Sequence, residues 1–292
     1  SNYKTPYNVM IVGLGNIGFR HLQAIVSTNI NISLHLVEIN NDNINRCKDY
    51  LKDNNILDYN FYSHIKNINT VNVFDILILS TCSDIRLKII EDIANNSNIE
   101  KINNLILEKI IFTNYDYFNK IKELLSTKIN LKNIYCSSDW YSRFNLDKIS
   151  QKYNLLNSTV HVNGNNWGLA CNSIHAIMCF LKIFSIFNFE TENINIIDTK
   201  RMGFREITGA FVDKHLILED NINCEDVLSI KILTNNEKIF LKLTTDWDNI
   251  SVKITSKDDT IIEEYLMEEQ YLSTHYINEY RNLIYGDSSN LI

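Results

Sequence analysis

The sequence has little proline, little glycine and no apolar run long enough to cross a membrane. Proline occurs once, at Pro6, and glycine occurs eight times in 292 residues. With frequent asparagine and isoleucine, the shortage of proline indicates a codon bias toward A and T over the whole chain, not a low-complexity segment. No apolar run reaches roughly eighteen residues, and no signal peptide precedes the first predicted strand. We therefore expect a cytoplasmic protein that makes no use of a membrane.

Paired cysteines and clustered basic residues are also missing. The six cysteines include no C-x-x-C pair, which disfavours a zinc knuckle and a disulfide framework. Cys171, His175 and Cys179 would share a helix face, but buried cysteines on a packed helix are commoner than a metal site, so we predict no metal. The net charge of -7 without a Lys/Arg cluster argues against nucleic acid and favours a small-molecule substrate.

A glycine-rich segment near the N-terminus is the strongest motif that the sequence contains. Val9–Val12 is a short apolar run typical of a strand buried on both faces. Gly13, Gly15 and Gly18 follow it as G-x-G-x-x-G and precede a helical pattern. In a dinucleotide-binding turn, these three glycines permit the tight turn, the approach of a diphosphate and the packing of helix on strand.

The residues around this turn predict which dinucleotide it binds. Asn16 and Ile17 would begin the helix, where N–H groups and the positive end of the helix dipole face the phosphates. Glu38 follows the apolar run Ile32–Val37, about twenty residues beyond the last glycine, where a carboxylate accepts the ribose hydroxyls of NAD. A carboxylate would repel the 2'-phosphate of NADP, and no arginine follows before Arg46. The pattern therefore favours NAD over NADP, with a plain strand-turn-helix as the alternative.

Strands alternate with helices through the first half, so we predict an α/β Rossmann domain with a doubly wound parallel sheet over residues 1–138. The further expected strands are Asn60–Tyr62, Phe74–Thr81, Asn104–Lys109 and Asn133–Ser137, and the further expected helices are Asn43–Asn54, Asp84–Asn95 and Tyr115–Ser126. Ligands of such sheets bind off the carboxyl ends of the strands. Thr81, Cys82, Glu108, Lys109 and Asp139 lie at those ends.

Residues 139–292 have a different pattern, which predicts an α+β domain with a large open, mostly antiparallel sheet. A long apolar helix is expected over 168–187 and a closing helix over Leu272–Ile284. The expected strands are Thr159–Val162, Asn193–Ile197, Ile207–Val212, Val227–Leu233, Lys238–Thr244, Ile250–Thr255 and Thr260–Leu266.

Four motifs resemble the Gfo/Idh/MocA family, the group of glucose-fructose oxidoreductase and inositol dehydrogenase. They are GLGNIGFRH (Gly13–His21), STCSD (Ser80–Asp84), LEKI (Leu107–Ile110) and WGLACNSIH (Trp167–His175). The family usually has E-K-P where this chain has LEKI, and a proline where Cys82 stands. Together with Thr199–Gly209, the motifs are most similar to those of members linked to surface-sugar biosynthesis.

The resemblance implies hydride transfer between NAD and a hydroxyl or carbonyl of a sugar or sugar-derived substrate, which can be nucleotide-linked or acidic. It places Lys109 beside the nicotinamide and His175 on the other side of the reacting hydroxyl, as the catalytic pair. Such a pair is needed because the hydroxyl proton departs as the carbonyl forms. Thr81, Cys82 and Glu108 are implied to line the cofactor.

Two departures from the family pattern favour an alternative, a relative that binds dinucleotide or sugar without turnover. The aspartate that the family has four residues before the histidine is Cys171 here, and the aspartate three residues after it is Met178. Neither side chain can orient His175 as a carboxylate would. Asn172 can position a substrate hydroxyl, but it cannot act as a base.

The remaining substrate candidates are also implied by the resemblance. Asp139 and Arg143 compete for the place where the family often has an arginine that contacts substrate. Trp167 could stack on a sugar ring or pack in the core. Family members commonly pair through the open sheet of the second domain, so a homodimer or homotetramer is expected.

Overall fold

The computed structural model describes residues 5–109, 115–137, 159–163, 189–196, 225–232, 237–244, 251–255, 261–266 and 272–285. The chain divides into two compact units. Of the described residues, those up to Ser137 and those of the closing helix form the first unit, and the strands between them form the second.

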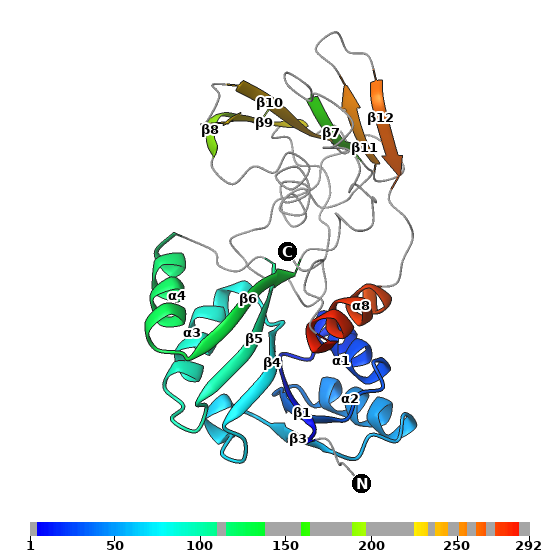
Figure 1. The fold of residues 1–292 in the computed structure, drawn as a ribbon, viewed down its shortest axis with the longest axis vertical. Helices are drawn as coiled ribbons and strands as arrows, with labels where there is room; N and C mark the ends of the chain where they lie inside the picture. Colours follow the sequence, from blue (N-terminus) through cyan, green and yellow to red (C-terminus); the bar gives the residue numbers. More distant parts are fainter. Residues whose placement is uncertain are drawn as a thin grey trace. The chain divides into compact units, whose positions relative to one another are not determined.

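The first unit contains a six-stranded sheet in the order β3-β2-β1-β4-β5-β6, and every neighbouring pair is parallel (Figure 1). The strands are β1 (Tyr7–Val12), β2 (Ile32–Val37), β3 (Tyr59–Tyr62), β4 (Val73–Leu79), β5 (Lys101–Glu108) and β6 (Leu131–Ser137). This order reverses direction between β1 and β4, and doubly wound sheets bind their ligands at the carboxyl ends of the strands beside such a reversal. The predicted N-terminal Rossmann domain is confirmed.

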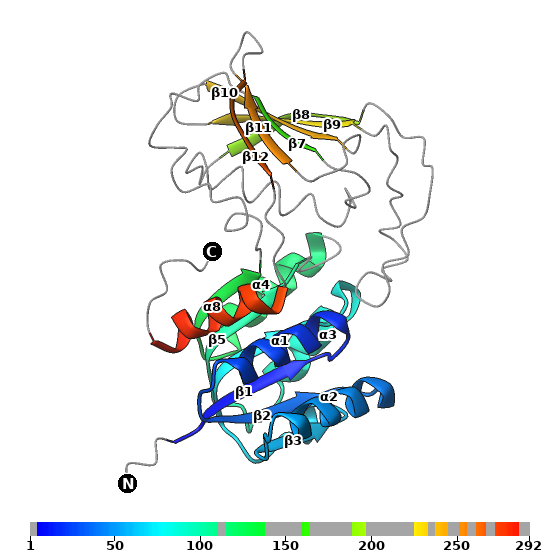
Figure 2. The same ribbon diagram turned by 90° about the vertical axis from the view of Figure 1, so that its right-hand side faces the viewer.

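Helices cover both faces of this sheet (Figures 1 and 2). They are α1 (Asn16–Ser27), α2 (Asn41–Asp53), the short 3-10 helix η1 (Ile65–Asn67), α3 (Ser83–Ala94), α4 (Tyr115–Thr127) and α8 (Leu272–Tyr285). Local chemistry sets where α2 begins, because the Asn40 side chain accepts hydrogen bonds from the N–H groups of Asp42 (2.9 Å) and Asn43 (3.2 Å).

Two hydrophobic cores lie on the two faces of the sheet, as the alternation of side chains along β1 shows. Val9 and Ile11 belong to the core under α1, α2 and α8, whereas Met10 and Val12 belong to the core under α3 and α4. All four side chains are buried, and each contributes about 1.5–3 kcal/mol relative to exposure. The strand β1 is apolar at every one of these four positions, without the alternation of a half-exposed strand, because both of its faces are covered.

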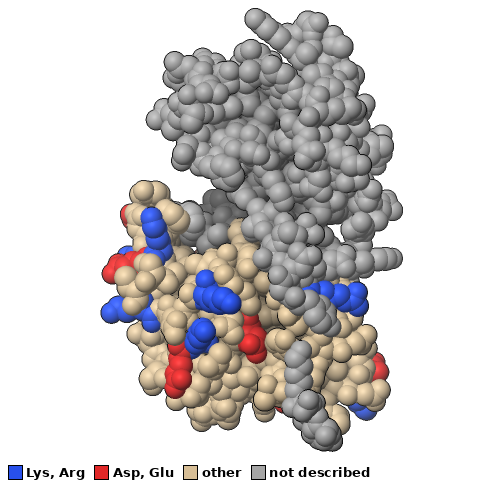
Figure 3. All heavy atoms as spheres, viewed as in Figure 1, with Lys and Arg blue, Asp and Glu red and all other residues tan. Residues whose placement is uncertain are grey.

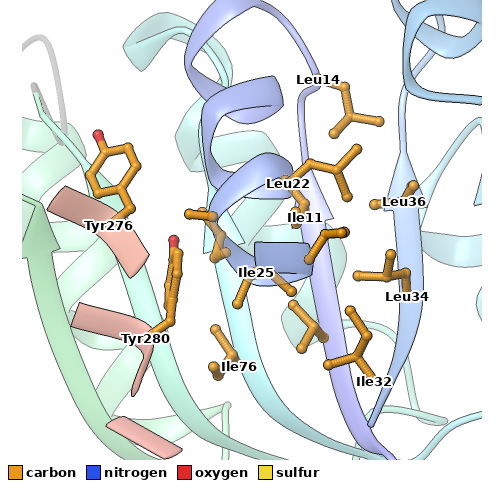
Figure 4. Packing of buried hydrophobic residues seen from close by; sticks show 14 of the residues in the cluster. Ile11, Leu14, Leu22, Ile25, Ile32, Leu34, Leu36, Ile76, Tyr276 and Tyr280 are labelled. Carbon is orange, nitrogen blue, oxygen red and sulfur yellow. The ribbon is translucent and has the colours of Figure 1, made fainter. Parts of the chain in front are cut away.

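The closing helix α8 packs on α1, beside the first core. Tyr276 and Tyr280 are buried in that core with Ile25 of α1 (Figure 4). The sequence-based division at residue 138 counted this helix with the second domain, whereas the structure places it in the first unit. The reason is tertiary, because a helix joins the sheet that buries its apolar face wherever it stands in the chain.

The second unit contains a six-stranded sheet in the order β12-β11-β7-β10-β9-β8. Its strands are β7 (Thr159–Asn163), β8 (Phe189–Ile196), β9 (Glu225–Ile232), β10 (Glu237–Thr244), β11 (Ser251–Thr255) and β12 (Ile261–Leu266). Neighbouring strands are antiparallel except β7 and β10, which are parallel. The helix expected over 168–187 and the strand expected over Ile207–Val212 lie outside the described residues.

None of the helices that the structure describes has the length and apolar character needed to cross a membrane. On the face of the first unit shown in Figure 3, basic and acidic side chains of the described residues are interspersed.

Candidate functional site

The turn between β1 and α1 uses its three glycines in two different ways. Gly13 has a φ of +85°, and a Cβ there would lie 2.7 Å from Cγ2 of Thr81. A Cβ at Gly18 would lie 1.8 Å from the carbonyl oxygen of Gly13. A Cβ at Gly15, by contrast, would meet no heavy atom within 4 Å. Gly13 and Gly18 therefore serve the packing of the protein, whereas Gly15 borders open space.

This open space adjoins the N-terminus of α1. Gly15 is the N-cap residue, and no side chain caps the helix. Asn16 and Ile17 are the first two helical residues, so their N–H groups lie among the four that a helix cannot pair internally. Uncapped N–H groups, the positive end of the helix dipole and room for a ligand together fit an anion such as a diphosphate.

Glu38, directly after β2, closes one side of the same turn. Its Oε2 accepts hydrogen bonds from the N–H of Leu14 (2.8 Å) and the Asn43 side-chain amide (3.1 Å). Its Oε1 accepts from the N–H groups of Ile39 (2.8 Å) and Asn40 (2.9 Å). Four donors match the four or so lone-pair sites of a carboxylate, so Glu38 is held rigidly as an anion beside the turn.

Arg46 reaches the turn from α2, a contact that the sequence pattern did not indicate. One guanidinium nitrogen donates to the carbonyls of Leu14 (2.8 Å) and Gly15 (3.1 Å), and the other donates to the Asn16 side chain (3.2 Å). The guanidinium also lies 4.5 Å above the ring of Phe19. Arg46 thus braces the outer side of the turn and places a positive charge next to the open space.

The carboxyl end of β4 meets the turn from the other side. The Ser80 hydroxyl lies 2.7 Å from the carbonyl of Gly13 and 3.2 Å from that of Val12, so it bonds the turn directly. Thr81 packs against Gly13, and its hydroxyl oxygen is buried without a hydrogen-bond partner within the described parts of the chain. Cys82, half-buried, is the N-cap residue of α3. The structure therefore places the predicted Thr81 against the glycine turn, with Cys82 next to it at the start of α3.

Glu108, the last residue of β5, lies in a buried polar cluster formed with α1 and α8. Its Oε1 is 2.5 Å from Nε2 of His21 and accepts a hydrogen bond from the Tyr276 hydroxyl at 2.9 Å. His21 is hydrogen-bonded to the Tyr280 hydroxyl through Nδ1, and its ring stacks on that of Tyr276 with 4.0 Å between centroids. His21 and Tyr280 have no exposed surface and Glu108 is 7% exposed. We call these four residues the His21 cluster.

Tyr280 keeps its proton in this cluster. Burial raises the pKa of Tyr280 well above its ordinary value, and the charges of Glu279 and Glu108 raise it further. Its hydroxyl and Nδ1 of His21 share a hydrogen bond whose direction depends on the tautomer of the ring.

Arg86 of α3 ties the carboxyl ends of β4 and β5 together. It donates one hydrogen bond to the backbone carbonyl of Glu108 and another, at 2.5 Å, to that of Thr81. Its side chain is only 1% exposed. Burial lowers the pKa of Arg86 to about 10, against the opposing effect of the Glu108 charge, so the guanidinium is still cationic at neutral pH.

Lys109 follows Glu108 directly and is half-buried. Its backbone position is thereby fixed by the contacts of its neighbour with α1, α3 and α8. The other residues predicted for catalysis or substrate binding lie outside the described residues: His175, Asp139, Arg143, Trp167 and Asn172, together with Cys171 and Met178. Among the residues that are described, no group of three His, Cys, Asp or Glu side chains is placed to hold a metal ion.

Sequence reasoning gave no role to several residues that the structure brings into the site. Tyr276 and Tyr280 stand four residues apart in the closing helix, a spacing that places both on one helix face and is visible in the sequence. His21 follows Gly18 by three residues, so it too falls on the packed side of its helix. Nothing in the sequence, however, indicates that these faces meet, because their contact joins residues 259 positions apart.

Comparison with known proteins rests on solved structures, since no family model and no curated protein sequence matches this chain. The transcriptional regulator Gal80p of Kluyveromyces lactis matches with a TM-score of 0.65 at 12% identity, over 95% of this chain and 82% of that one. Myo-inositol 2-dehydrogenase of Lactobacillus plantarum matches with a TM-score of 0.64 at 10% identity, over 97% and 89%. The WlbA dehydrogenase of Thermus thermophilus, solved with NAD and α-ketoglutarate, matches with a TM-score of 0.60 at 13% identity, over 96% and 89%. The chain shares the fold of these proteins.

Proposed function

We propose that this chain, which has the Gfo/Idh/MocA fold, is an NAD-dependent oxidoreductase acting on a hydroxyl or carbonyl of a sugar-like molecule. One observation carries the proposal. The space beside Gly15 is open and adjoins the uncapped N-terminus of α1, and the carboxylate of Glu38 accepts a hydrogen bond from the N–H of Leu14, the residue before Gly15. If the turn served packing alone, we would expect atoms of the protein to fill the space at Gly15 as they do at Gly13 and Gly18.

The N–H groups of Asn16 and Ile17 would bind the diphosphate, since they have no side-chain cap to compete with it. Glu38 would accept the ribose hydroxyls. All its acceptor sites are occupied in this structure, and three of its four donors are backbone N–H groups. The amide of Asn43 is the one donor on a rotatable side chain, so we expect a ribose hydroxyl to take its place on Oε2.

The charge of Glu38 favours NAD over NADP, because a 2'-phosphate would be brought against a fixed carboxylate. Arg46 stands nearby, but two backbone carbonyls and the Asn16 side chain already accept its hydrogen bonds. A 2'-phosphate would have to compete with those acceptors as well as with Glu38. The selectivity therefore depends mainly on the carboxylate.

When bound, the nicotinamide supplies the hydride acceptor or donor. Lys109 would hydrogen-bond the reacting oxygen of the substrate and hold or release its proton, a role in which an ammonium group also stabilises developing negative charge. His175 is the second proposed proton carrier by resemblance. The proposed substrate is small and sugar-like, nucleotide-linked or acidic, and the substrate candidates remain Asp139, Arg143, Trp167 and Asn172. We also expect the open sheet of the second unit to pair with a second copy.

The test is turnover of NAD or NADH with a panel of nucleotide-linked and acidic sugars. We expect Lys109→Ala to lower kcat by about 10²- to 10⁴-fold, the usual share of a positioned proton carrier, while NADH affinity is retained. Lys101→Ala is the matched control, because Lys101 begins the same strand at the end away from the site. Wild-type kcat in Lys109→Ala would refute the assigned role.

A second candidate is a relative that binds the dinucleotide without turnover. It is favoured by the similarity to Gal80p, whose structure is described as that of a transcriptional regulator, and by Cys171 and Met178 in place of carboxylates. Under this reading NADH binds, no sugar in the panel reacts, and Cys171→Asp gains turnover. Measurable turnover by the wild-type protein excludes it.

A further inference from the structure

Arg46 of α2 donates hydrogen bonds to two successive peptide groups of the glycine turn. One of its guanidinium nitrogens lies 2.8 Å from the carbonyl oxygen of Leu14 and 3.1 Å from that of Gly15. The other lies 3.2 Å from Oδ1 of Asn16, the first residue of α1. Arg46 therefore bonds each residue from 14 to 16, the stretch next to the proposed diphosphate.

The direction of the N–H groups in this turn follows from where those carbonyls are held. A trans peptide group is planar, and its C=O and N–H point to opposite sides of the chain. The carbonyl of Leu14 shares a peptide with the N–H of Gly15, and the carbonyl of Gly15 shares one with the N–H of Asn16. Because both carbonyls are bonded to Arg46, both N–H groups are directed away from it. Neither N–H has an acceptor within the described part of the chain.

The peptide that joins Leu14 to Gly15 depends most on Arg46. The carbonyl of Gly15 also accepts the first bond of the helix, from the N–H of Phe19 at 2.9 Å, whereas Arg46 is the donor that the described residues provide for the carbonyl of Leu14. Gly15 has no side chain to hold it, and no heavy atom lies within 4 Å of the place that a Cβ would take. The orientation of the Gly15 N–H is therefore set by the bond from Arg46 to Leu14.

Stability alone is a poor explanation for this arrangement. The Nε atom of Arg46 is buried without a hydrogen-bond partner among the described residues, and an unpaired buried donor is costly. The guanidinium lies 4.5 Å from the centre of the Phe19 ring. An apolar side chain on α2 could pack on that ring without burying a donor. What the arginine adds is a fixed direction for the peptides that it bonds, because hydrogen bonds hold atoms at set distances and angles.

We propose that Arg46 is a positioning residue of the dinucleotide site, which directs the N–H groups of Gly15 and Asn16 toward the diphosphate by holding the carbonyls of the same peptides. The inference rests on the proposed function, since it needs a diphosphate at this turn. Arg46 acts through the backbone, and no contact with the ligand is assigned to it. Its role thus differs from that of Glu38, whose carboxylate is proposed to bind the ribose.

The variant Arg46→Met tests this role, because methionine keeps an unbranched apolar side chain beside Phe19 and removes every donor. Arg20→Met is the matched control, since Arg20 is an exposed arginine of α1 that bonds Gln23. The Kd values of ADP and adenosine are measured by calorimetric titration of the folded wild type and both variants. Each titration is made at about 0.1 M and about 0.5 M salt, because salt screens the charge of an arginine but not the geometry of a backbone.

We expect Arg46→Met to raise the Kd of ADP about tenfold at both salt concentrations and to change the Kd of adenosine, which has no phosphate, by less than about twofold. Arg20→Met should leave both Kd values at the wild-type level. Unchanged ADP affinity in Arg46→Met would overturn the proposal, and so would an equal loss for ADP and adenosine. A loss that disappears at the higher salt concentration would also overturn it, since only the charge of Arg46 would then matter.

A readout without ligand separates this inference from the proposed function. Glycine-selective ¹⁵N labelling gives signals from only eight residues, and the signal that disappears in Gly15→Ala identifies Gly15. Residual dipolar couplings in a neutral stretched gel report the direction of its N–H bond, with the other glycines as the reference for alignment. The Gly15 coupling should change in Arg46→Met and not in Arg20→Met. If the wild type binds neither ADP nor NADH, the proposed function fails, whereas an unchanged Gly15 coupling in Arg46→Met refutes the inference.

Discussion

The carboxyl ends of β2 and β5 each hold a glutamate, and the two are held in opposite ways. Glu38, after β2, is half-buried and accepts hydrogen bonds from residues within 24 positions along the chain, mostly from backbone N–H groups. Glu108, at the end of β5, is buried and is bonded by side chains 87 and 168 positions away. We refer to Glu38 with the adjoining Gly15 as the open end, and to the His21 cluster as the closed end.

The difference teaches what each end can do. Backbone donors at the open end hold a carboxylate in place next to open space, as the proposed dinucleotide site requires. The closed end has its carboxylate buried against α1 and α8, where His21 and Tyr276 hold it, so it ties both helices to the end of β5. One sheet thus carries the open end after β2 and the closed end after β5, with β1 and β4 between them.

The largest expected effect is on the free energy of unfolding, when the carboxylate of Glu108 or that of Glu38 is removed. Glu108→Ala leaves His21 and Tyr276 without their buried acceptor, and the loss of one partner of a buried pair costs about 3–5 kcal/mol. Glu38→Ala frees donors that water can reach, at a cost of about 1–2 kcal/mol. Urea unfolding monitored by circular dichroism measures both free energies. Equal losses would remove the distinction between the two ends.

The second prediction compares Gly15, at the open end, with Gly18, on the packed side of α1. In Gly18→Ala the new methyl group would clash with the backbone carbonyl of Gly13, so we expect a loss of about 1–3 kcal/mol or more. Gly15 has a φ of -62°, which alanine adopts freely, and open space around it. Gly15→Ala should therefore change the free energy of unfolding by less than about 0.5 kcal/mol.

The Gly15→Ala variant also separates an effect on binding from an effect on stability. Gly15→Ala is expected to weaken NADH binding, measured by quenching of its intrinsic fluorescence, because the methyl group enters the space left for the diphosphate. Unchanged NADH affinity in a stable Gly15→Ala protein would mean that the space beside Gly15 is not a ligand site.

These contrasts also explain how much the sequence could predict. The open end follows from a local pattern, since an apolar run, three glycines and an acid about twenty residues later suffice to place Glu38 beside the turn. The closed end depends on α8 returning to the first sheet, and neither the periodicity of that helix nor the order of elements indicates which sheet buries it. The same limit applies to Arg46, because its hydrogen bonds join it to Leu14 and Gly15, 32 and 31 positions away, once α2 lies beside the turn.

The smallest predicted effect concerns His35, a buried histidine of β2. His35 of β2 lies by the hydroxyls of Ser33 and Tyr62 and against the ring of Phe74, with Asp58 nearby, whereas His21 contacts a carboxylate. Burial lowers the pKa of His35 below 6.5, against the opposing charge of Asp58. The unfolded chain therefore binds more protons below pH 6.5, and the stability from neutral His35 is full above that pH and is lost as pH falls through the lowered pKa.

We expect His35→Gln to flatten the dependence of unfolding free energy on pH between about 5 and 7 relative to the wild type. Urea unfolding at a series of pH values measures it, with His64→Gln as a control substitution at an exposed histidine. A steeper slope in His35→Gln would show that the sign of the shift is wrong.

Calorimetric titration with NADH and NADPH of the folded wild-type protein and of Glu38→Ala tests the central claim most directly. The account predicts that the wild type binds NADH more tightly than NADPH, and that Glu38→Ala weakens NADH binding far more than NADPH binding. Absence of heat with both coenzymes on folded wild-type protein would contradict it.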